Sequence, residues 1–137
     1  MPTSLAVMRM SAGQRDELVE HARDSTPNEC CGYMRLSDGE VEELFRAENL
    51  RNSPYGYELD AKSLLRANEL DDEGFGVAIY HSHPRSAAEP SQTDINLAQY
   101  PHWLQVIVTL AGRDDGPEVR AWRIEDGRVE EEDVVVE

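Results

Sequence analysis

Two short and almost uninterrupted apolar runs constrain the fold of this chain more than any other feature. They are Gly76–Tyr80 and Trp103–Leu110. A strand has this composition when both faces of its sheet are covered, because neither of its alternating sets of side chains then meets water. The sequence therefore predicts a sheet with two central, buried strands and enough further elements to cover both faces.

Periodicity and turn signals place the remaining elements around these two strands. Ser11 and Gln14 have the spacing of a capping box at the start of a helix, and Asp126-Gly127 is typical of a hairpin turn. Helices are predicted over 12–23, 61–70 and a short stretch from Ser91, and further strands over 3–10, 30–36, 41–47, 57–59, 118–124 and 128–136. Strands with helices between them predict an α/β fold, a mixed β-sheet sandwiched by helices. The 137 residues show no linker or repeat and are expected to form a single domain, 1–137.

The charge balance argues against two classes of partner. The chain has 28 acidic and 13 basic residues, for a net charge of −15. Nucleic acid and anionic membranes are bound by clustered Lys and Arg, which this sequence lacks. Lys62 is the single lysine among the basic residues. This bias fits either a GC-rich genome with an ordinary acidic surface or a salt-rich cytoplasm, in which ions screen the repulsion between carboxylates.

The cysteines and the N-terminus indicate a cytoplasmic protein. Cys30 and Cys31 are adjacent, and neighbouring cysteines do not easily reach disulfide geometry, so two reduced thiols are expected. The first ten residues contain no signal-peptide pattern, and no apolar stretch approaches the length of about 18 residues needed to cross a membrane.

A pair of histidines follows the first buried run. His81 and His83 are two residues apart, so on a strand they point to the same side and can offer nitrogens to one ion. Pro84 cannot continue a central ladder, which places the pair at the end of the strand. Asp94 lies in the first turn of the following short helix, and two His with one carboxylate form a ligand set of catalytic zinc sites.

Each of these residues also has a purely structural interpretation. A His-x-His pair alone is more often incidental than metal-binding, and His21 and His102 are expected at the surface. Asp94 lies three residues after Ser91, so it also fits the acidic position of an N-terminal helix cap. Glu29 alone is an acid in a turn. Composition and spacing leave a metal site and a structural role equally open.

The motifs taken together resemble those of a known family, the JAMM or MPN-plus zinc metalloproteases. Residues 81–84 (His-Ser-His-Pro) and 90–94 (Pro-Ser-x-x-Asp) are similar to its metal motif, and residues 27–32 to its upstream segment with a catalytic Glu. The resemblance is closest to the small prokaryotic branch, and further similarities lie at Asn49, Ser53-Pro54, Tyr57, Asp60 and Trp122-Arg123-Ile124.

The resemblance implies a role for each matching residue. His81, His83 and Asp94 would bind Zn²⁺, which would lower the pKa of its bound water to about 7. Glu29 would take the proton of the water and pass it to the leaving nitrogen. Ser91 would donate a hydrogen bond to the oxyanion. The implied fold is the MPN fold, akin to the cytidine deaminases.

Three other functions compete with this hypothesis. A zinc deaminase needs a Cys-x-x-Cys signature that is absent here. A thiol hydrolase built on Cys31 with His81 and Asp94 would leave the second histidine without a role. A non-catalytic MPN scaffold remains the alternative from another class, although scaffolds of this family have lost the metal ligands, which are all present in this sequence.

The resemblance also implies a substrate. Small prokaryotic members act on the C-terminal tail of ubiquitin-like or sulfur-carrier proteins, releasing either an amino acid or a lysine-linked protein. We expect hydrolysis directly after a Gly-Gly tail, which would lie as an extended peptide beside a free sheet edge. The choice between peptide and isopeptide bond, and the oligomeric state, stay open at this point.

Overall fold

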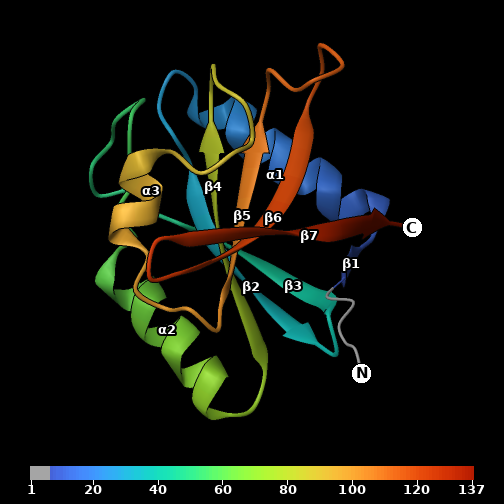
Figure 1. Cartoon of the computed structure of the whole chain (residues 1–137), viewed down its shortest axis with the longest axis vertical. Coiled ribbons are helices and arrows are strands. Elements are labelled where there is room, and N and C mark those ends of the chain that lie inside the picture. The colour runs from blue at the N-terminus through green and yellow to red at the C-terminus, as the bar shows by residue number, and fades with distance from the viewer. Residues whose placement is uncertain (1–6) are drawn as a thin grey trace.

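The computed structural model describes residues 7–137 as one mixed sheet with three helices (Figure 1). The helices are α1 (Ala12–Ser25), α2 (Ala61–Asp72) and α3 (Gln92–Leu97). The strands are β1 (Val7–Met10), β2 (Cys31–Ser37), β3 (Glu40–Ala47), β4 (Gly76–His83), β5 (Leu104–Thr109), β6 (Glu118–Glu125) and β7 (Arg128–Val136).

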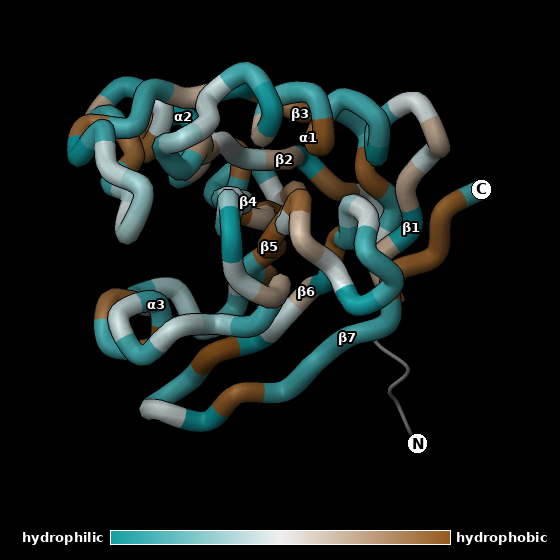
Figure 2. Tube along the Cα trace, turned by 90° about the horizontal axis from the view of Figure 1, so that it is seen from above, coloured by the Kyte–Doolittle hydropathy of each residue, from teal (hydrophilic) through white to brown (hydrophobic). Residues whose placement is uncertain are grey.

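The two apolar runs form the centre of the sheet, as predicted. The strand order is β1-β3-β2-β4-β5-β6-β7, and β4 and β5 run parallel to each other. β4 is antiparallel to β2 on its other side, which makes the sheet mixed. The sheet then closes on itself, because β1 pairs with both β3 and β7 in parallel. Figure 2 shows hydrophobic stretches in the central strands β4 and β5, while hydrophilic and hydrophobic residues alternate along β7.

The helices cover opposite faces of the sheet, which confirms the predicted layers. α1 packs Leu18 and Val19 into a core cluster that includes Ala78 and Tyr80 of β4. α2 packs on the other face, where Ala67 and Leu70 join a second cluster. That second cluster holds Val77 and Ile79, the residues of β4 that alternate with Ala78 and Tyr80. The residues of β4 therefore alternate between the two helices, as the period of a strand requires.

The structure differs from the sequence-based prediction in several secondary-structure elements. Part of the first predicted strand, residues 3–6, lies outside the described residues. The predicted strand at 57–59 is wrong, because this segment forms only an isolated bridge between Leu59 and Asn49. β4 continues to His83, so both histidines belong to the strand itself. Leu65 of α2 faces solvent with 61 % exposure, because the core-facing stripe of the helix runs through Ala67 and Leu70.

The two histidines outside the His81–His83 pair differ in their burial. His21 was expected at the surface but is buried, with Nδ1 2.7 Å from the hydroxyl oxygen of Tyr80. His102 lies at the surface as expected, whereas both tryptophans are buried. The free sheet edge expected beside the histidines is absent within residues 7–137, because β4 lies between β2 and β5. Over the same residues, no helix is long and apolar enough to span a membrane.

Candidate metal centre

The end of β4 presents two imidazoles on the face covered by α2. His81 and His83 continue the alternation of Val77 and Ile79, and both are buried. The ring of Tyr57 stacks on the His81 ring, with 4.4 Å between centroids and 18° between planes. The ring of His83 is fixed differently, since its Nδ1 lies 2.8 Å from the carbonyl oxygen of Ala87. Backbone and stacking contacts thus set both ring orientations.

The short helix α3 brings a carboxylate to the same place. Ser91 caps the helix, and its hydroxyl oxygen accepts a hydrogen bond from the backbone N–H of Asp94. The Asp94 carboxylate in turn accepts from the backbone N–H of Ser91 through Oδ2, at 2.9 Å. The capping interpretation is therefore correct. It does not compete with a ligand role, because the same Oδ2 also faces both imidazoles.

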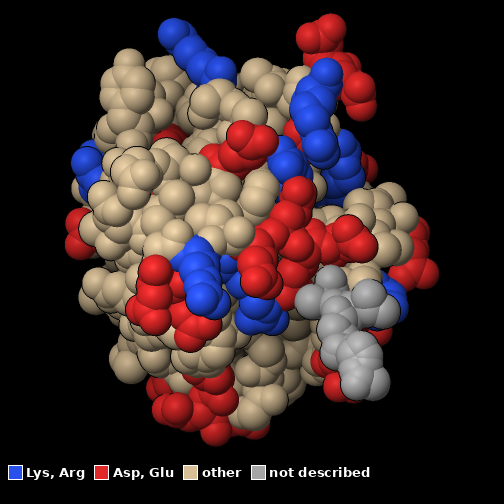
Figure 3. Space-filling view, in the orientation of Figure 1, with Lys and Arg blue, Asp and Glu red and all other residues tan. Residues whose placement is uncertain are grey.

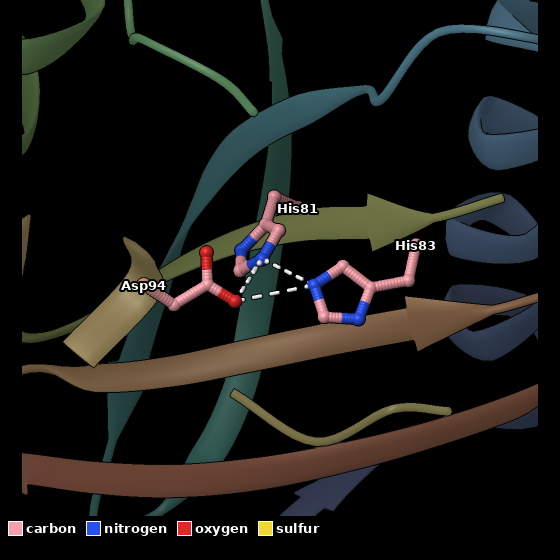
Figure 4. A group of neighbouring side chains, drawn as sticks. All are labelled: His81, His83 and Asp94. Carbon is pink, nitrogen blue, oxygen red and sulfur yellow. Dashed lines mark hydrogen bonds and ion pairs between the residues drawn. The ribbon is translucent and has the colours of Figure 1, made fainter. Parts of the chain in front are cut away.

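Three potential ligand atoms converge in a small triangle (Figure 4). The Nε2 atoms of His81 and His83 are 3.2 Å apart. Oδ2 of Asp94 lies 3.2 Å from Nε2 of His81 and 3.1 Å from Nε2 of His83. Bonds of about 2.0–2.1 Å to a tetrahedral zinc would separate neighbouring ligand atoms by about 3.3 Å. The spacing of the three atoms thus matches one face of a zinc tetrahedron.

The proton positions favour a cation at this triangle. The carbonyl oxygen of Ala87 can only accept, so Nδ1 of His83 carries the proton and a neutral ring leaves a lone pair on Nε2. That lone pair points at a carboxylate oxygen and at a second imidazole. Such a cluster of acceptors needs either an extra proton or a metal ion, and a histidine that donates to a carbonyl is the common arrangement around zinc. The donor set therefore fits a zinc ion.

The Asp94 carboxylate remains ionised in this setting. Burial raises its pKa, but the close contacts of Oδ2 with the His81 and His83 rings outweigh burial and hold the pKa well below the usual range. Burial also lowers the pKa of His81. A divalent cation binds ligands that carry no proton on the coordinating atom. An ionised carboxylate beside a neutral imidazole meets that requirement.

Glu29 lies beside the triangle without joining it. The pairing of β2 with β4 sets Cys31 opposite His81, and the same register continued by two residues places Glu29 opposite His83. The side chain is buried, and its Oε1 has no hydrogen-bond partner among the described residues. Burial is the main cause that raises the Glu29 pKa to about 7, and the Asp94 charge contributes while His83 and Arg51 oppose. A carboxyl group with that pKa can both take and give a proton near neutral pH.

The segment between β3 and α2 forms a wall of the site that the sequence did not predict in detail. Asn49 holds it together, because its Nδ2 donates to the carbonyl oxygens of Glu29 and Gly56. Its Oδ1 accepts from the backbone N–H groups of Arg51 and Glu58. The family resemblance had pointed to Asn49 and Tyr57, whereas Arg51 carried no signal in the sequence. The contact with Glu29 joins segments 20 residues apart, and the other three depend on the backbone conformation of the loop, so composition could not reveal them.

The thiol alternative fails on the structure. The Cys31 thiol is buried and donates to the carbonyl oxygen of Glu48 over 3.6 Å. Burial is the main reason that its pKa rises to about 12. A thiol in this state carries almost no thiolate at neutral pH and is not a nucleophile.

A groove of about 520 Å³ opens beside Asp94, between α3 and the start of α2. Its apolar lining is formed by Tyr57, Leu59, Leu64, Ile79, Leu97 and Tyr100. Figure 3 shows a largely uncharged surface over α3, while acidic side chains gather around β7. A neutral, extended segment of a partner can therefore reach the triangle without crossing the acidic part of the surface.

The sequence of this chain is similar to those of known proteins. Residues 11–125 match a family model described as prokaryotic homologs of the JAB domain. The CysO-cysteine peptidase of Mycobacterium tuberculosis is 39 % identical over 136 residues, which cover 95 % of this chain and 91 % of the relative. A desampylase of Haloferax volcanii is 32 % identical over 117 residues, covering 77 % and 83 % of the two chains.

Solved structures agree with the sequence matches. Protein DSY2949 from Desulfitobacterium hafniense has a TM-score of 0.79 and 29 % identity, covering 95 % of this chain and 92 % of that chain. AF2198, a JAB1/MPN domain protein from Archaeoglobus fulgidus, has a TM-score of 0.57 at 22 % identity, covering 93 % and 99 %. The second likeness concerns the fold alone, and it identifies the mixed sheet with its helices as the MPN fold predicted from the sequence.

Proposed function

Because the chain belongs to the prokaryotic JAB-domain branch of the JAMM/MPN family, we propose that it is a zinc-dependent peptidase. The observation that carries this proposal is the triangle of His81, His83 and Asp94 beside a buried Glu29. An assembly module would have no need for three converging ligand atoms next to an unpaired buried carboxylate. The full set of side chains therefore favours catalysis over a scaffold role.

In this proposal His81, His83 and Asp94 hold Zn²⁺. When bound, zinc supplies Lewis-acid chemistry, which polarises a carbonyl and makes water nucleophilic at neutral pH. Glu29 removes a proton from the attacking water and returns it to the leaving nitrogen, a use for which a pKa of about 7 is suited. The Ser91 hydroxyl accepts a hydrogen bond as a helix cap, so its own hydrogen is free to be donated to the oxyanion.

The proposed substrate is the C-terminal tail of a ubiquitin-like or sulfur-carrier protein. The name of the mycobacterial relative indicates that it acts on CysO-cysteine, and the Haloferax relative is a desampylase. The groove beside Asp94 has a largely apolar lining that suits an extended, uncharged tail, and the surface over α3 is largely uncharged. Since β4 has strands on both sides, the tail cannot extend the sheet there. It would instead form backbone hydrogen bonds with the 49–59 segment or pack against α3. Glycines at the end of the tail would let its backbone approach the triangle closely.

Two broader features belong to the same proposal. We propose that residues 1–137 act as a single catalytic domain, which is supported by the one continuous sheet that runs through residues 7–136. We also propose a reducing, cytoplasmic location, which is supported by two free and buried thiols, Cys30 and Cys31.

The decisive experiment joins metal analysis to product analysis. Freshly purified protein should contain close to one zinc per chain, and the His81→Ala/His83→Ala double variant should contain almost none. The zinc-loaded protein should cut a carrier protein directly after its Gly-Gly tail, as read by mass spectrometry. Full zinc in the double variant would refute the ligand assignment. Stable protein that takes up no added zinc and cuts no carrier would instead support the scaffold function.

A further inference from the structure

Arg51 stands out as a positive charge beside the proposed site. We propose that Arg51 binds the α-carboxylate of the amino acid that leaves the scissile bond. The site would then prefer a peptide bond to a free C-terminal residue over an isopeptide bond to a lysine side chain. This inference rests on the proposed peptidase function and specifies its leaving group.

The segment that carries Arg51 is tied directly to Glu29. Oδ1 of Asn49 accepts a hydrogen bond from the backbone N–H of Arg51 at 3.0 Å. Nδ2 of Asn49 donates a hydrogen bond to the carbonyl oxygen of Glu29, also at 3.0 Å. The backbone N–H of Glu29 in turn donates to the carbonyl oxygen of Ser53 at 2.9 Å. Arg51 also lines the groove that reaches Asp94. One hydrogen-bonded unit thus holds the arginine, the proposed proton shuttle and the mouth of the groove together.

The guanidinium group of Arg51 is held over Gly56 and has no hydrogen-bond or ion-pair partner among the residues that the structure describes. A Cβ atom at Gly56 would lie only 2.8 Å from Nη1 and 2.9 Å from Cζ of Arg51, so the missing side chain provides the space for the guanidinium. Among residues 7–137, no carboxylate pairs with this guanidinium, whereas Arg120 pairs with Glu131 and Glu89. An unpaired arginine in a groove of a chain with net charge −15 is available for a ligand.

The position of Arg51 corresponds to the leaving-group side of the bond. Glu29 gives its proton to the leaving nitrogen, so that nitrogen must lie close to Glu29. In a C-terminal amino acid, the carboxylate is attached to the same carbon as this nitrogen. Ile79 precedes His83, the residue opposite Glu29, by four residues on β4, and it lines the groove together with Leu64 of α2. This apolar part of the groove is left for the carrier tail.

Electrostatics favour a guanidinium beside such a substrate. A terminal carboxylate at this site would lie near Glu58, which lines the groove, and near the proposed proton shuttle Glu29, while zinc bound at Asp94 would offset the charge of that aspartate. A guanidinium can offset the repulsion from these acidic side chains and bind a carboxylate through two parallel hydrogen bonds. An isopeptide-linked lysine has its nitrogen at the end of a long aliphatic chain and no carboxylate beside it. It would therefore leave Arg51 without a ligand.

Matched peptides test this inference. The first peptide is an acetylated tail that ends in Gly-Gly-Ala with a free carboxylate, and the second is identical except for a terminal carboxamide. A third carries Gly-Gly on the side-chain nitrogen of a blocked lysine. We expect kcat/KM of the wild type to be about tenfold to a hundredfold higher for the free acid than for the other two, the range of a charge-assisted hydrogen-bonded pair.

Variants at one position separate recognition from folding. Arg51→Gln should lower cleavage of the acid far more than cleavage of the amide, so that the preference for the acid is lost, while Arg51→Lys should keep part of the preference. Arg9→Gln is the control, because Arg9 is an exposed residue of β1, at the opposite end of the molecule from α3 (Figure 1). Equal cleavage of acid and amide by the wild type, or an equal loss on both in Arg51→Gln, would overturn the inference.

A binding measurement keeps this test independent of catalysis. Calorimetric titration of the Glu29→Gln protein with the acid and the amide should show tighter binding of the acid, and adding Arg51→Gln should abolish the difference. If the wild type cleaves neither peptide nor a carrier protein, the peptidase proposal fails. The titration still decides whether Arg51 recognises a carboxylate, and equal affinities there would refute that recognition.

Discussion

At the scale of single residues, the proton shuttle gives the sharpest prediction. Glu29→Gln keeps the size of the side chain and touches no proposed ligand, so the variant should fold and keep its zinc. General acid–base groups contribute about 10²–10⁴-fold to rate, and kcat should fall by that factor. Initial rates and elemental analysis on the same sample provide the measurement. A loss below tenfold, with zinc retained, would exclude this role for Glu29.

His21 gives a residue-scale prediction about stability against pH. Burial is the main cause that lowers its pKa from 6.5 to about 4, helped by Arg46 of β3 and opposed by Asp24 of α1. Between pH 6.5 and about 4, His21 is therefore protonated in the unfolded chain and neutral in the folded chain. The stabilisation that depends on neutral His21 is complete above pH 6.5 and is lost as the pH falls towards 4. It amounts to at most about 3 kcal/mol.

The test for His21 is chemical denaturation at pH 7.5 and at pH 4.5. Wild type should lose more unfolding free energy between these values than His21→Gln, which can keep the contact with Tyr80 but does not titrate. The two proteins share every other ionisable group, so the difference between the two losses isolates this residue. Equal losses would show that His21 titrates alike in both states.

At the scale of secondary-structure elements, the cap of α3 serves both folding and the site. Ser91→Ala removes the hydroxyl that accepts the Asp94 N–H, and a lost cap costs about 1 kcal/mol. If Ser91 also stabilises the oxyanion, kcat should fall by about 10²–10³-fold, far more than the cap explains. A thermal melt beside the kinetics separates the two effects. A small shift in Tm with unchanged kcat would leave Ser91 as a cap alone.

The loop between β4 and α3 is fixed by a second element, β6. The Trp122 indole N–H donates to the carbonyl oxygen of Ala88 at 3.0 Å, next to the Ala87 carbonyl that orients His83. Trp122→Phe should therefore loosen this loop and weaken zinc affinity by up to about tenfold, the lower end of effects measured for groups that orient metal ligands. Competition with a chelator measures the change.

Trp103→Phe is the matched control for that experiment. Trp103 is also buried, and its indole N–H donates to Asp71 at the end of α2, outside the metal centre. Both variants should lower Tm, since each removes one hydrogen bond of a buried indole. Only the Trp122 variant should change zinc affinity. If both affinities stay at the wild-type value, the β4–α3 loop does not depend on β6 for its position.

At the scale of the whole molecule, the surface charge predicts a response to salt. The net charge is −15 with a single lysine, and acidic side chains gather around β7 (Figure 3). At 1 M salt the Debye length falls to about 3 Å, which removes most long-range repulsion between carboxylates. We expect Tm to rise as KCl goes from dilute to molar. A constant Tm would indicate an ordinary acidic composition without adaptation to salt.

The sequence by itself determined the features that depend on local pattern. Continuous apolar runs identified β4 and β5, because a strand that is covered on both faces has apolar side chains at successive positions. Ser11 with Gln14 predicted the start of α1, since a capping box satisfies backbone N–H groups within one turn. The spacing of His81 and His83 fixed their common face. The family resemblance, not the spacing, then singled out Asp94 and Glu29 as their partners.

Only the tertiary structure decided what depends on packing between distant segments. Closure of the sheet through β1 and burial of His21 arise from contacts that no local pattern encodes. The Ala87 carbonyl that orients His83 is a backbone group and has no residue signature. The placement of Arg51 over Gly56 depends on the fold of the 49–59 segment around Asn49. Backbone geometry and long-range hydrogen bonds set the chemistry of each group, and they exist only once the chain has folded.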